Sequence, residues 1–310
     1  MLRGKRLLVI LNPASGRGTA DTVERAIAAR LSELGARAEV RRTAAAGDAT
    51  AWASGAASEG FEIVLVAGGD GTVTAAAAGI VRAGHGLPLG VVPMGTGNGL
   101  ARVLHIPIDP VKALGALAGG VTVRLDVMRR VDRDEMALIF FGAGLDAEIN
   151  RDADAASKKR FGFLAYLGAA ARNLWGRRNH RIELTLDGQS ETLLAHTVSL
   201  FNAASVELAG LDVGPDVDPH DGQLDVAVLR NPGFLRSLAA VLRLVSGRRG
   251  VGELRRARHV RVEAEPPLLV HADGEVVGYT PLEVELLPRA LIAIAASEYR
   301  DEAIAAGREP

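Results

Sequence analysis

The chain has 310 residues, of which 48% are apolar and 24% charged, a composition typical of a globular protein rather than of a disordered or fibrous one. Its 36 basic and 37 acidic residues leave a net charge of -1, which argues against a dedicated nucleic-acid-binding protein, because phosphate binding depends on a positive excess. The absence of cysteine excludes disulfides, thiolate zinc sites, iron–sulfur clusters and cysteine nucleophiles.

The N-terminal part of the chain alternates between short apolar runs and helical patterns, which predicts a doubly wound, Rossmann-like parallel sheet with helices on both faces. The predicted strands are residues 6–11, 37–42, 62–66 and 87–92. The predicted helices are residues 20–34, 48–58 and 72–83. Right-handed crossovers bring the carboxyl ends of the strands to one edge, where open α/β sheets bind ligands.

The pattern changes near Asp126, after which short alternating runs predict an antiparallel β-sandwich domain. The predicted strands are residues 137–141, 181–186, 192–201, 224–229, 259–264, 268–272 and 282–286. Two helices are predicted, at residues 158–175 and 234–246. The apolar run at residues 7–11 is too short for a signal peptide, and no stretch reads as a membrane span, so we expect a cytoplasmic protein.

A glycine-rich turn at residues 68–72, with Asp70 at its centre, follows the third predicted strand. Glycines let the backbone approach a phosphate and point N–H groups at it, and the following helix adds its positive N-terminal end. Because Asp70 repels a phosphate, we expect a divalent metal between the two, as in Mg²⁺–nucleotide sites. The alternative is a tight strand-to-helix turn in which Asp70 caps the helix.

Two further turns follow the first and fourth predicted strands. Residues 93–99 form a second candidate phosphate cradle, and residues 12–18 offer a hydroxyl, a guanidinium and flexible backbone. Neither turn is a dinucleotide fingerprint or a Walker A motif. Each turn alone is explained as a simple loop, but three turns at one sheet edge favour a ligand site.

In their order and spacing, these motifs resemble the diacylglycerol kinase catalytic domain family, which includes soluble bacterial diacylglycerol kinases, related bacterial lipid kinases, sphingosine kinases and ceramide kinases. The motifs that carry the resemblance are Asn12-Pro-x-Ser-Gly, Gly68-Gly-Asp-Gly-Thr, Pro93-x-Gly-Thr-Gly-Asn, Gly142-x-Gly-x-Asp146-Ala, Pro219-x-Asp221-Gly-x-Leu-Asp225-Val and Asp273-Gly-Glu275. The resemblance implies a nucleotide-binding α/β domain over residues 1–127, to which residues 290–310 return. It also implies a lipid-binding β-sandwich over residues 128–289.

The resemblance also implies roles for individual residues. The nucleotide-binding positions are Asn12, Ser15, Gly16, Thr43, Gly68, Gly69, Asp70, Gly71, Thr72, Val73, Thr74, Gly95, Thr96, Gly97, Asn98 and Glu275. Asp273 matches the proposed general base, with Asp70 as the second catalytic carboxylate. Asp221, with the main-chain carbonyls of Asp218 and Gln223, matches a structural Mg²⁺ site. Without the resemblance, Asp273-Gly274 and Asp221-Gly222 are interpreted as hairpin turns.

One residue departs from the family pattern, and the histidines show no metal-ligand spacing. Many bacterial diacylglycerol kinases have an aspartate after the asparagine of the third motif, where this chain has Gly99. The departure puts the identity of the acceptor lipid in question. The histidines are interpreted as surface or packing residues, with His271 on the strand that leads to Asp273.

Basic residues gather in two segments, residues 158–181 and 230–261, which hold 16 of the 36 basic residues and a single acid, Glu253. Both segments include amphipathic stretches, a combination that suits the surface of an anionic membrane. The alternative is an ordinary half-buried helix with a solvated polar face. The expected partners are a lipid substrate, the anionic inner face of the membrane and, in a homodimer, a second copy; no nucleic acid is expected.

The expected activity is transfer of the γ-phosphate of ATP, with Mg²⁺, to a lipid hydroxyl, with diacylglycerol as the first acceptor. Alternatives are a sphingosine-like or other lipid acceptor, NAD kinase, and a non-catalytic nucleotide- or lipid-binding regulator. NAD kinase shares the Gly-Gly-Asp-Gly turn. The Asn-Pro-x-Ser-Gly turn and the Asp273-Gly-Glu275 motif favour the lipid kinase over it.

Overall fold

The computed structural model describes residues 1–15, 20–144, 179–203, 207–208, 211–212, 217–229 and 253–305. The chain forms two compact units. The first comprises Met1–Val127, Pro219–Gly222 and Leu287–Pro310, and the second comprises Met128–Asp218 and Gln223–Leu286. The helices predicted at residues 158–175 and 234–246 lie outside the described residues.

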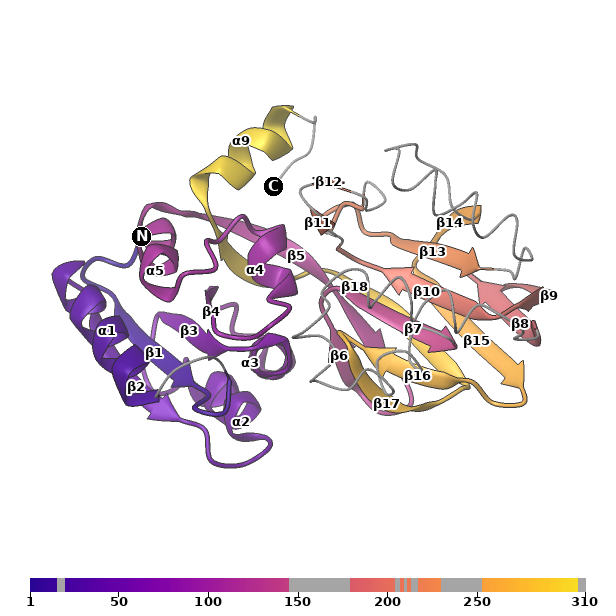
Figure 1. The fold of residues 1–310 in the computed structure, drawn as a ribbon, viewed down its shortest axis with the longest axis horizontal. Coiled ribbons are helices and arrows are strands. Elements are labelled where there is room, and N and C mark those ends of the chain that lie inside the picture. Colours follow the sequence, from indigo (N-terminus) through magenta and orange to yellow (C-terminus); the bar gives the residue numbers. More distant parts are fainter. Residues whose placement is uncertain are drawn as a thin grey trace. The chain divides into compact units, whose positions relative to one another are not determined.

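The first unit is built on a parallel sheet with the strand order β2-β1-β3-β4-β18 (Figure 1). The strands are β1 (Arg6–Leu11), β2 (Arg37–Arg42), β3 (Ile63–Gly68), β4 (Leu89–Pro93) and β18 (Leu282–Ala295), whose C-terminal part belongs to this unit. Strands β3 and β4 are buried along their whole length, and β1 beyond its first residue. Such continuous burial is typical of parallel strands with helices on both faces.

The described residues of the first unit include six helices. They are α1 (Ala20–Glu33), α2 (Asp48–Gly55), α3 (Asp70–Ala83), α4 (Gly99–Val103), α5 (Pro110–Gly119) and α9 (Ser297–Ala305). Because the strand order reverses at β1, right-handed crossovers place α1 on one face of the sheet and α2 and α3 on the other. Helix α2 packs along α3, and α1 along α5 (Figure 1).

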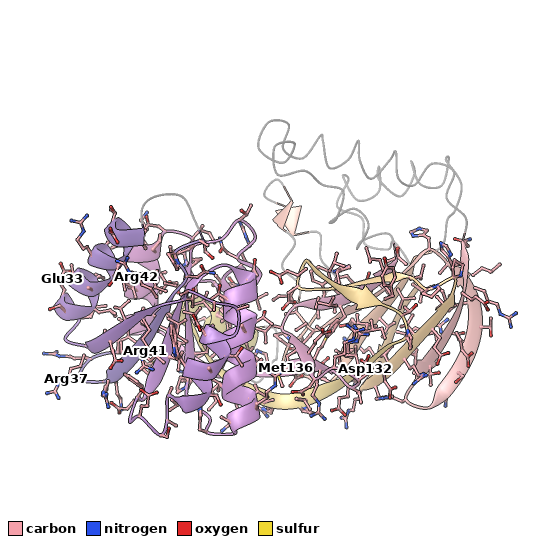
Figure 2. The ribbon with its side chains drawn as sticks, turned by 90° about the horizontal axis from the view of Figure 1, so that it is seen from below. Glu33, Arg37, Arg41, Arg42, Asp132 and Met136 are labelled. Atoms are coloured by element: carbon pink, nitrogen blue, oxygen red, sulfur yellow. The ribbon has the colours of Figure 1, made fainter. Side chains whose placement is uncertain are left out.

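Strand β2 forms an edge of this sheet and is rich in charge. Figure 2 labels three of its arginines, Arg37, Arg41 and Arg42. Arg41 pairs with Glu39 at 2.7 Å and with Glu59 at 2.5 Å. Charged side chains on an edge strand discourage pairing with a strand of another molecule.

The second unit contains two sheets that enclose one apolar core. One sheet has the order β14-β13-β10-β7-β16-β17, with β7 (Phe140–Gly144), β10 (Thr197–Phe201), β13 (Leu224–Leu229), β14 (Glu253–Ala257), β16 (Leu269–Ala272) and β17 (Glu275–Tyr279). The other joins the first part of β18 to β15 (His259–Glu265), β8 (His180–Leu186) and β9 (Gln189–Ala195). Strand β6 (Glu135–Ala137) pairs with β5 (Val121–Arg130), and β11 (Glu207–Leu208) pairs with β12 (Leu211–Asp212).

These two architectures confirm the predicted fold class, an α/β domain with a parallel sheet and an antiparallel β-sandwich. Several strand boundaries differ from the prediction. Residues 192–201, predicted as one strand, form β9 and β10, which are interrupted at His196. Residues 137–141, also predicted as one strand, are divided between β6 and β7. Both breaks fall within apolar runs, where side-chain alternation alone does not reveal a change of partner strand.

Strand β18 continues to Ala295, beyond its predicted end at residue 286. Pro288 lacks an N–H donor, and Arg289 has φ of +52°, so the local sequence favours a break. The strand resumes because the Arg289 N–H donates to Asp126 Oδ1 at 2.7 Å, outside the ladder. Among the described residues, eight further elements lie outside the predicted set: α4, α5, α9, β5, β11, β12, β14 and β17.

Arg130, in the second unit, is a buried charged residue that donates hydrogen bonds to main-chain oxygens in β17 and just after it. Its side chain is 1% exposed, and its guanidinium donates to Asp132 at 2.7 Å. Further donor groups reach the main-chain oxygens of Val277 at 3.3 Å, Tyr279 at 3.4 Å and Pro281 at 3.3 Å. A charge this deeply buried is tolerated because its donors are satisfied.

The crossing of α2 and α3 predicts a stability difference between two glycine variants. A Cβ on Gly79 would lie 2.3 Å from the main-chain oxygen of Thr50, so Gly79→Ala should lower the free energy of unfolding by about 2 kcal/mol. Gly119→Ala is the control, because no described atom lies within 4 Å of its Cβ and alanine is the better helix former. Urea unfolding measures both variants; equal losses of stability would contradict the packing argument.

Candidate active site

Three turns at the carboxyl ends of β1, β3 and β4 lie against one another. Asn12 Nδ2 donates to Thr72 Oγ1 at 2.8 Å, which ties the first turn to the second. A Cβ on Gly95 would lie only 2.8 Å from the Cα of Gly69, so the second and third turns meet backbone to backbone. A Cβ on Gly69 would lie 3.7 Å from Ser15 Oγ. One edge of the sheet therefore carries a single cluster of glycine-rich backbone.

Helix α3 begins within this cluster, with Gly69 as its N-cap and Gly71 and Thr74 in its first turns. Its N-cap residue, Gly69, has no side chain that could cap the helix. The N–H groups of its first turn therefore keep the partial positive charge of a helix N-terminus beside the glycine cluster. Helix N-termini next to glycine-rich backbone are binding sites for phosphate groups.

The carboxylate of Asp70 is held by the backbone of the third turn. Its Oδ2 accepts the N–H of Asn98 at 2.8 Å, and its Oδ1 accepts the N–H of Gly99 at 2.6 Å. A Cβ on Gly97 would lie 2.7 Å from Oδ2, so the position excludes larger residues. Two N–H donors at the start of α4 therefore offset part of the Asp70 charge, for which the sequence predicts a metal.

The remaining predicted nucleotide-binding residues have different surroundings. Thr43 follows β2, and its N–H donates to the main-chain oxygen of Leu11 at 2.9 Å. The side chain of Val73 is buried, so only its backbone is available to a ligand. Thr96 is exposed. Gly16 lies outside the described residues.

Asp273 lies in the second unit, in the turn between β16 and β17. Asp273 and Gly274 have φ of +47° and +91°, and positive φ at both positions is the geometry of a type I′ hairpin. Asp273 and Gly274 therefore form the turn of a hairpin. Glu275 is exposed at the start of β17.

The Asp273 carboxylate accepts three successive backbone N–H groups. Leu138 donates to Oδ2 at 2.9 Å, while Ile139 and Phe140 donate to Oδ1 at 2.9 and 3.1 Å. These bonds fix both the position and the orientation of the carboxylate. Three donors on one acid constitute an anchor between the hairpin and the segment before β7.

His271 lies two residues before Asp273 and is fully buried. A Cβ on Gly142 in the neighbouring strand would lie 2.3 Å from its Nε2, so the imidazole occupies space that only a glycine leaves open. The ring also packs edge-on against Phe140, with centroids 4.8 Å apart. These contacts support its interpretation as a packing residue.

Asp126 in β5, which is not among the predicted site residues, is fully buried and accepts two backbone hydrogen bonds. Its Oδ2 accepts the N–H of Gly222 at 2.7 Å, and its Oδ1 accepts the N–H of Arg289 at 2.7 Å. Burial raises the pKa of the Asp126 carboxyl; these two N–H donors oppose the shift, and repulsion from Asp221 adds to it. The sequence feature that points to Asp126 is an acid within the apolar pattern of a strand.

The predicted Mg²⁺ ligands lie in and beside the turn formed by Pro219–Gly222. Asp221 belongs to the first unit, and Asp218 and Gln223, which flank the turn, belong to the second. In the part of the chain that the structure describes, no group of three or more acidic, histidine or cysteine side chains could hold a metal. The predicted site uses one carboxylate and two main-chain carbonyls, all hard oxygen donors of the kind that Mg²⁺ and Ca²⁺ accept.

The two basic segments lie largely outside the described residues. Where they are described, Arg255 forms an ion pair with Glu191, and Arg256 approaches Asp225 at 3.3 Å. These paired arginines contribute less unbalanced positive charge than the sequence count implies. Across the described ranges, no helix combines the length and the apolar character needed to cross a membrane.

Two protein families match the chain. The diacylglycerol kinase catalytic domain matches residues 6–130, and the YegS C-terminal NAD kinase beta sandwich-like domain matches residues 140–295. A diacylglycerol kinase of Mycobacterium tuberculosis is 30% identical over 296 residues, which cover 92% of this chain and 94% of that protein. The chain belongs to the diacylglycerol kinase family. It is therefore a lipid kinase, and the resemblance seen in its motifs is confirmed.

Two further relatives of this kinase extend the comparison. An uncharacterized protein of Synechocystis is 29% identical over 240 residues, 75% of this chain and 54% of that protein, so the chain spans about half of its length. The crystal structure of a diacylglycerol kinase from Bacillus anthracis matches with a TM-score of 0.76 at 25% identity, covering 95% of this chain and 98% of that one.

The glycine cluster predicts that Gly69→Ala weakens ATP binding while the fold survives. A Cβ on Gly69 meets Gly95 Cα at 3.5 Å and Ser15 Oγ at 3.7 Å, which are ordinary contacts, whereas a phosphate held against this backbone would collide with it. We expect a loss of affinity of at least about tenfold, or about 1.4 kcal/mol, by calorimetry. Unchanged ATP affinity in the folded variant would show that the turn is only structural.

Proposed function

We propose that this lipid kinase transfers the γ-phosphoryl group of Mg²⁺–ATP to the hydroxyl group of diacylglycerol, which yields phosphatidic acid and ADP. The observation that carries the proposal is the packing of three glycine-rich turns around the N-terminus of α3, an anion-binding arrangement at the carboxyl edge of a parallel sheet. The name of the relative from Mycobacterium tuberculosis, which matches along most of the chain, supports diacylglycerol as the acceptor.

In this reaction the lipid oxygen bonds to the γ-phosphorus while the bond from that phosphorus to the β,γ-bridging oxygen breaks, and the hydroxyl proton passes to a base. Catalysis of phosphoryl transfer depends mainly on positioning and electrostatic stabilisation. Backbone N–H groups of the Gly69–Gly71 turn and of Thr96 and Gly97 would hold the phosphate oxygens, with Asn12 and Ser15 beside them. Thr43 and Thr96 complete the proposed nucleotide site, and Asp70 would bind the Mg²⁺ that accompanies ATP.

Asp273 is proposed to orient the lipid hydroxyl and to accept its proton. A carboxylate whose place is set by the N–H groups of residues 138–140 needs no reorganisation at the moment of reaction. In a loose, metaphosphate-like transition state little covalent chemistry falls to the protein, so the position of this acid matters more than its strength as a base.

We also propose a structural Mg²⁺ bound by the Asp221 carboxylate and the main-chain carbonyls of Asp218 and Gln223. The donors are hard oxygens, as Mg²⁺ requires. Repulsion from Asp221 is one of the contributions that raise the pKa of the buried Asp126, and a bound divalent cation would offset that repulsion.

The acceptor lipid belongs to a bilayer, so we propose a cytoplasmic enzyme that touches the anionic inner face of the membrane through its two basic segments. The positive charge of those segments supports this placement.

A homodimer is the remaining proposal about partners, and analytical ultracentrifugation tests it.

Two other acceptors follow from specific observations. Gly99 replaces an acid that many bacterial diacylglycerol kinases carry, which keeps sphingosine-like lipids among the acceptors. The family matched over residues 140–295 is described as NAD kinase beta sandwich-like, which keeps NAD among the candidate acceptors as well. Labelled ATP incubated with diacylglycerol, sphingosine, a bacterial lipid extract and NAD, followed by chromatography, distinguishes these acceptors. Labelled phosphatidic acid supports the proposal, and a labelled product from NAD alone would replace it.

The role of Asp273 predicts a loss of turnover in Asp273→Asn of about 10²–10⁴-fold, the usual effect of removing a general base. Because the substitution also disturbs an anchor, Asp187→Asn is the matched control. Asp187 and Gly188 form the same kind of hairpin in the second unit, and the Asp187 carboxylate accepts the N–H groups of Arg258 and His259 at 2.9 Å each.

The control should lose stability without a comparable loss of turnover. Thermal unfolding measures the stability of both variants, and the labelled-ATP assay measures their turnover. If turnover falls equally in the two variants and in proportion to their loss of stability, Asp273 is only an anchor of the hairpin.

A further inference from the structure

The turn that carries Asp221 is fastened to β5 on both sides of that residue. On one side, the Gly222 N–H donates to Asp126 Oδ2 at 2.7 Å. On the other side, His220 Nδ1 lies 2.6 Å from the main-chain oxygen of Arg124. A carbonyl oxygen only accepts, so Nδ1 carries a proton and donates it to the Arg124 oxygen.

Tyr299 in α9 is the hydrogen-bond partner of the other ring nitrogen, Nε2. Its hydroxyl lies 2.6 Å from His220 Nε2, and its residue is 9% exposed. The Tyr299 ring also packs edge-on against His105, with centroids 5.5 Å apart, and against His220, at 5.9 Å. The start of α9 is held in turn by the Ala296 N–H, which donates to the main-chain oxygen of Leu104 at 3.0 Å.

We propose that Tyr299 and His220 are positioning residues for a divalent-cation site at Asp221. This inference rests on the proposed function, because the cation at Asp221 is proposed there. Both chain neighbours of Asp221 are held, His220 through both ring nitrogens and Gly222 through its N–H. The backbone under the Asp221 carboxylate is therefore preorganised, and less conformational freedom is lost when a cation binds.

Helix α9, which carries Tyr299, therefore contributes to the cation site at Asp221 as well as to the fold. A purely structural Tyr299 would lower the stability of the first unit without changing the concentration of cation that the protein requires. A positioning Tyr299 changes that concentration, because removing a residue that orients a metal ligand typically costs about 10–100-fold in metal affinity. The two roles are separated by the response of the protein to Mg²⁺ alone.

Tyr299→Phe is the sharpest test, since it removes the hydroxyl and keeps the ring against His105. The full-length protein, without nucleotide or lipid, is titrated with MgCl₂ while its thermal unfolding midpoint is measured. We expect Mg²⁺ to raise the midpoint of the wild type, Asp221→Asn to abolish the rise, and Tyr299→Phe to require about tenfold more Mg²⁺.

His220→Asn provides a second and independent variant. Its shorter amide can still donate to the main-chain oxygen of Arg124 but loses the partner of Tyr299. We expect the same shift in Mg²⁺ requirement as in Tyr299→Phe, and no further shift in the double variant, because the two residues act through one hydrogen bond.

Glu302→Gln is the matched control on the same helix. It weakens the contact of Glu302 with His105, whose Nε2 lies 3.6 Å away, and leaves the Tyr299–His220 bond in place. Its Mg²⁺ requirement should equal that of the wild type.

Three outcomes decide the inference. A shift in Tyr299→Phe and His220→Asn, absent from Glu302→Gln, supports it. A wild-type response that Asp221→Asn abolishes but Tyr299→Phe leaves unchanged overturns the positioning role and keeps the proposed cation site. No response of the wild type to Mg²⁺ overturns both the inference and the structural cation, whereas the kinase activity is judged separately by the labelled-ATP assay.

Discussion

The buried carboxylate of Asp126 is the contact on which the first unit depends, because it joins segments that lie far apart in the chain. Asp126 lies in the N-terminal segment, and its two oxygens accept N–H groups from Gly222 and Arg289, one from each of the other segments of that unit. A buried acid is tolerated only when its hydrogen bonds are satisfied, and its raised pKa reflects the remaining cost. The same contact lets β18 pass the irregular Pro288 and continue as a strand.

Backbone N–H groups hold the acids that matter most here. Asp70 and Asp126 each accept two such groups, and Asp273 accepts three. Each donor belongs to a turn, a strand irregularity or a helix start, so the location of each acid depends on local backbone conformation. Amide donors orient a carboxylate without placing a mobile cationic side chain beside it, and such a side chain would compete with a metal ion or substrate for the same acid.

Several elements show where sequence patterns stop being informative. Asp109, whose carboxylate accepts the N–H groups of Val111 and Lys112, is an N-cap with proline at the next position, a readable signal for the unpredicted α5. No comparable local signal marks the division between β9 and β10, because apolar residues occur on both sides of His196. The continuation of β18 likewise has no local sequence signal, since the Arg289 N–H donates to Asp126, an acid in another strand.

The sequence by itself determined the alternation of strands and helices, the change to antiparallel strands and the glycine turns at one sheet edge. These features are local, since periodicity records which side of an element is buried and glycine marks places where backbone meets backbone. Only the tertiary structure decided which amides hold the acids, and that Tyr299 reaches His220. Asp126 lies 96 positions from Gly222 and 163 from Arg289, and Tyr299 lies 79 from His220. Contacts over such separations exist only after the whole sheet has formed, so no local pattern of residues encodes them.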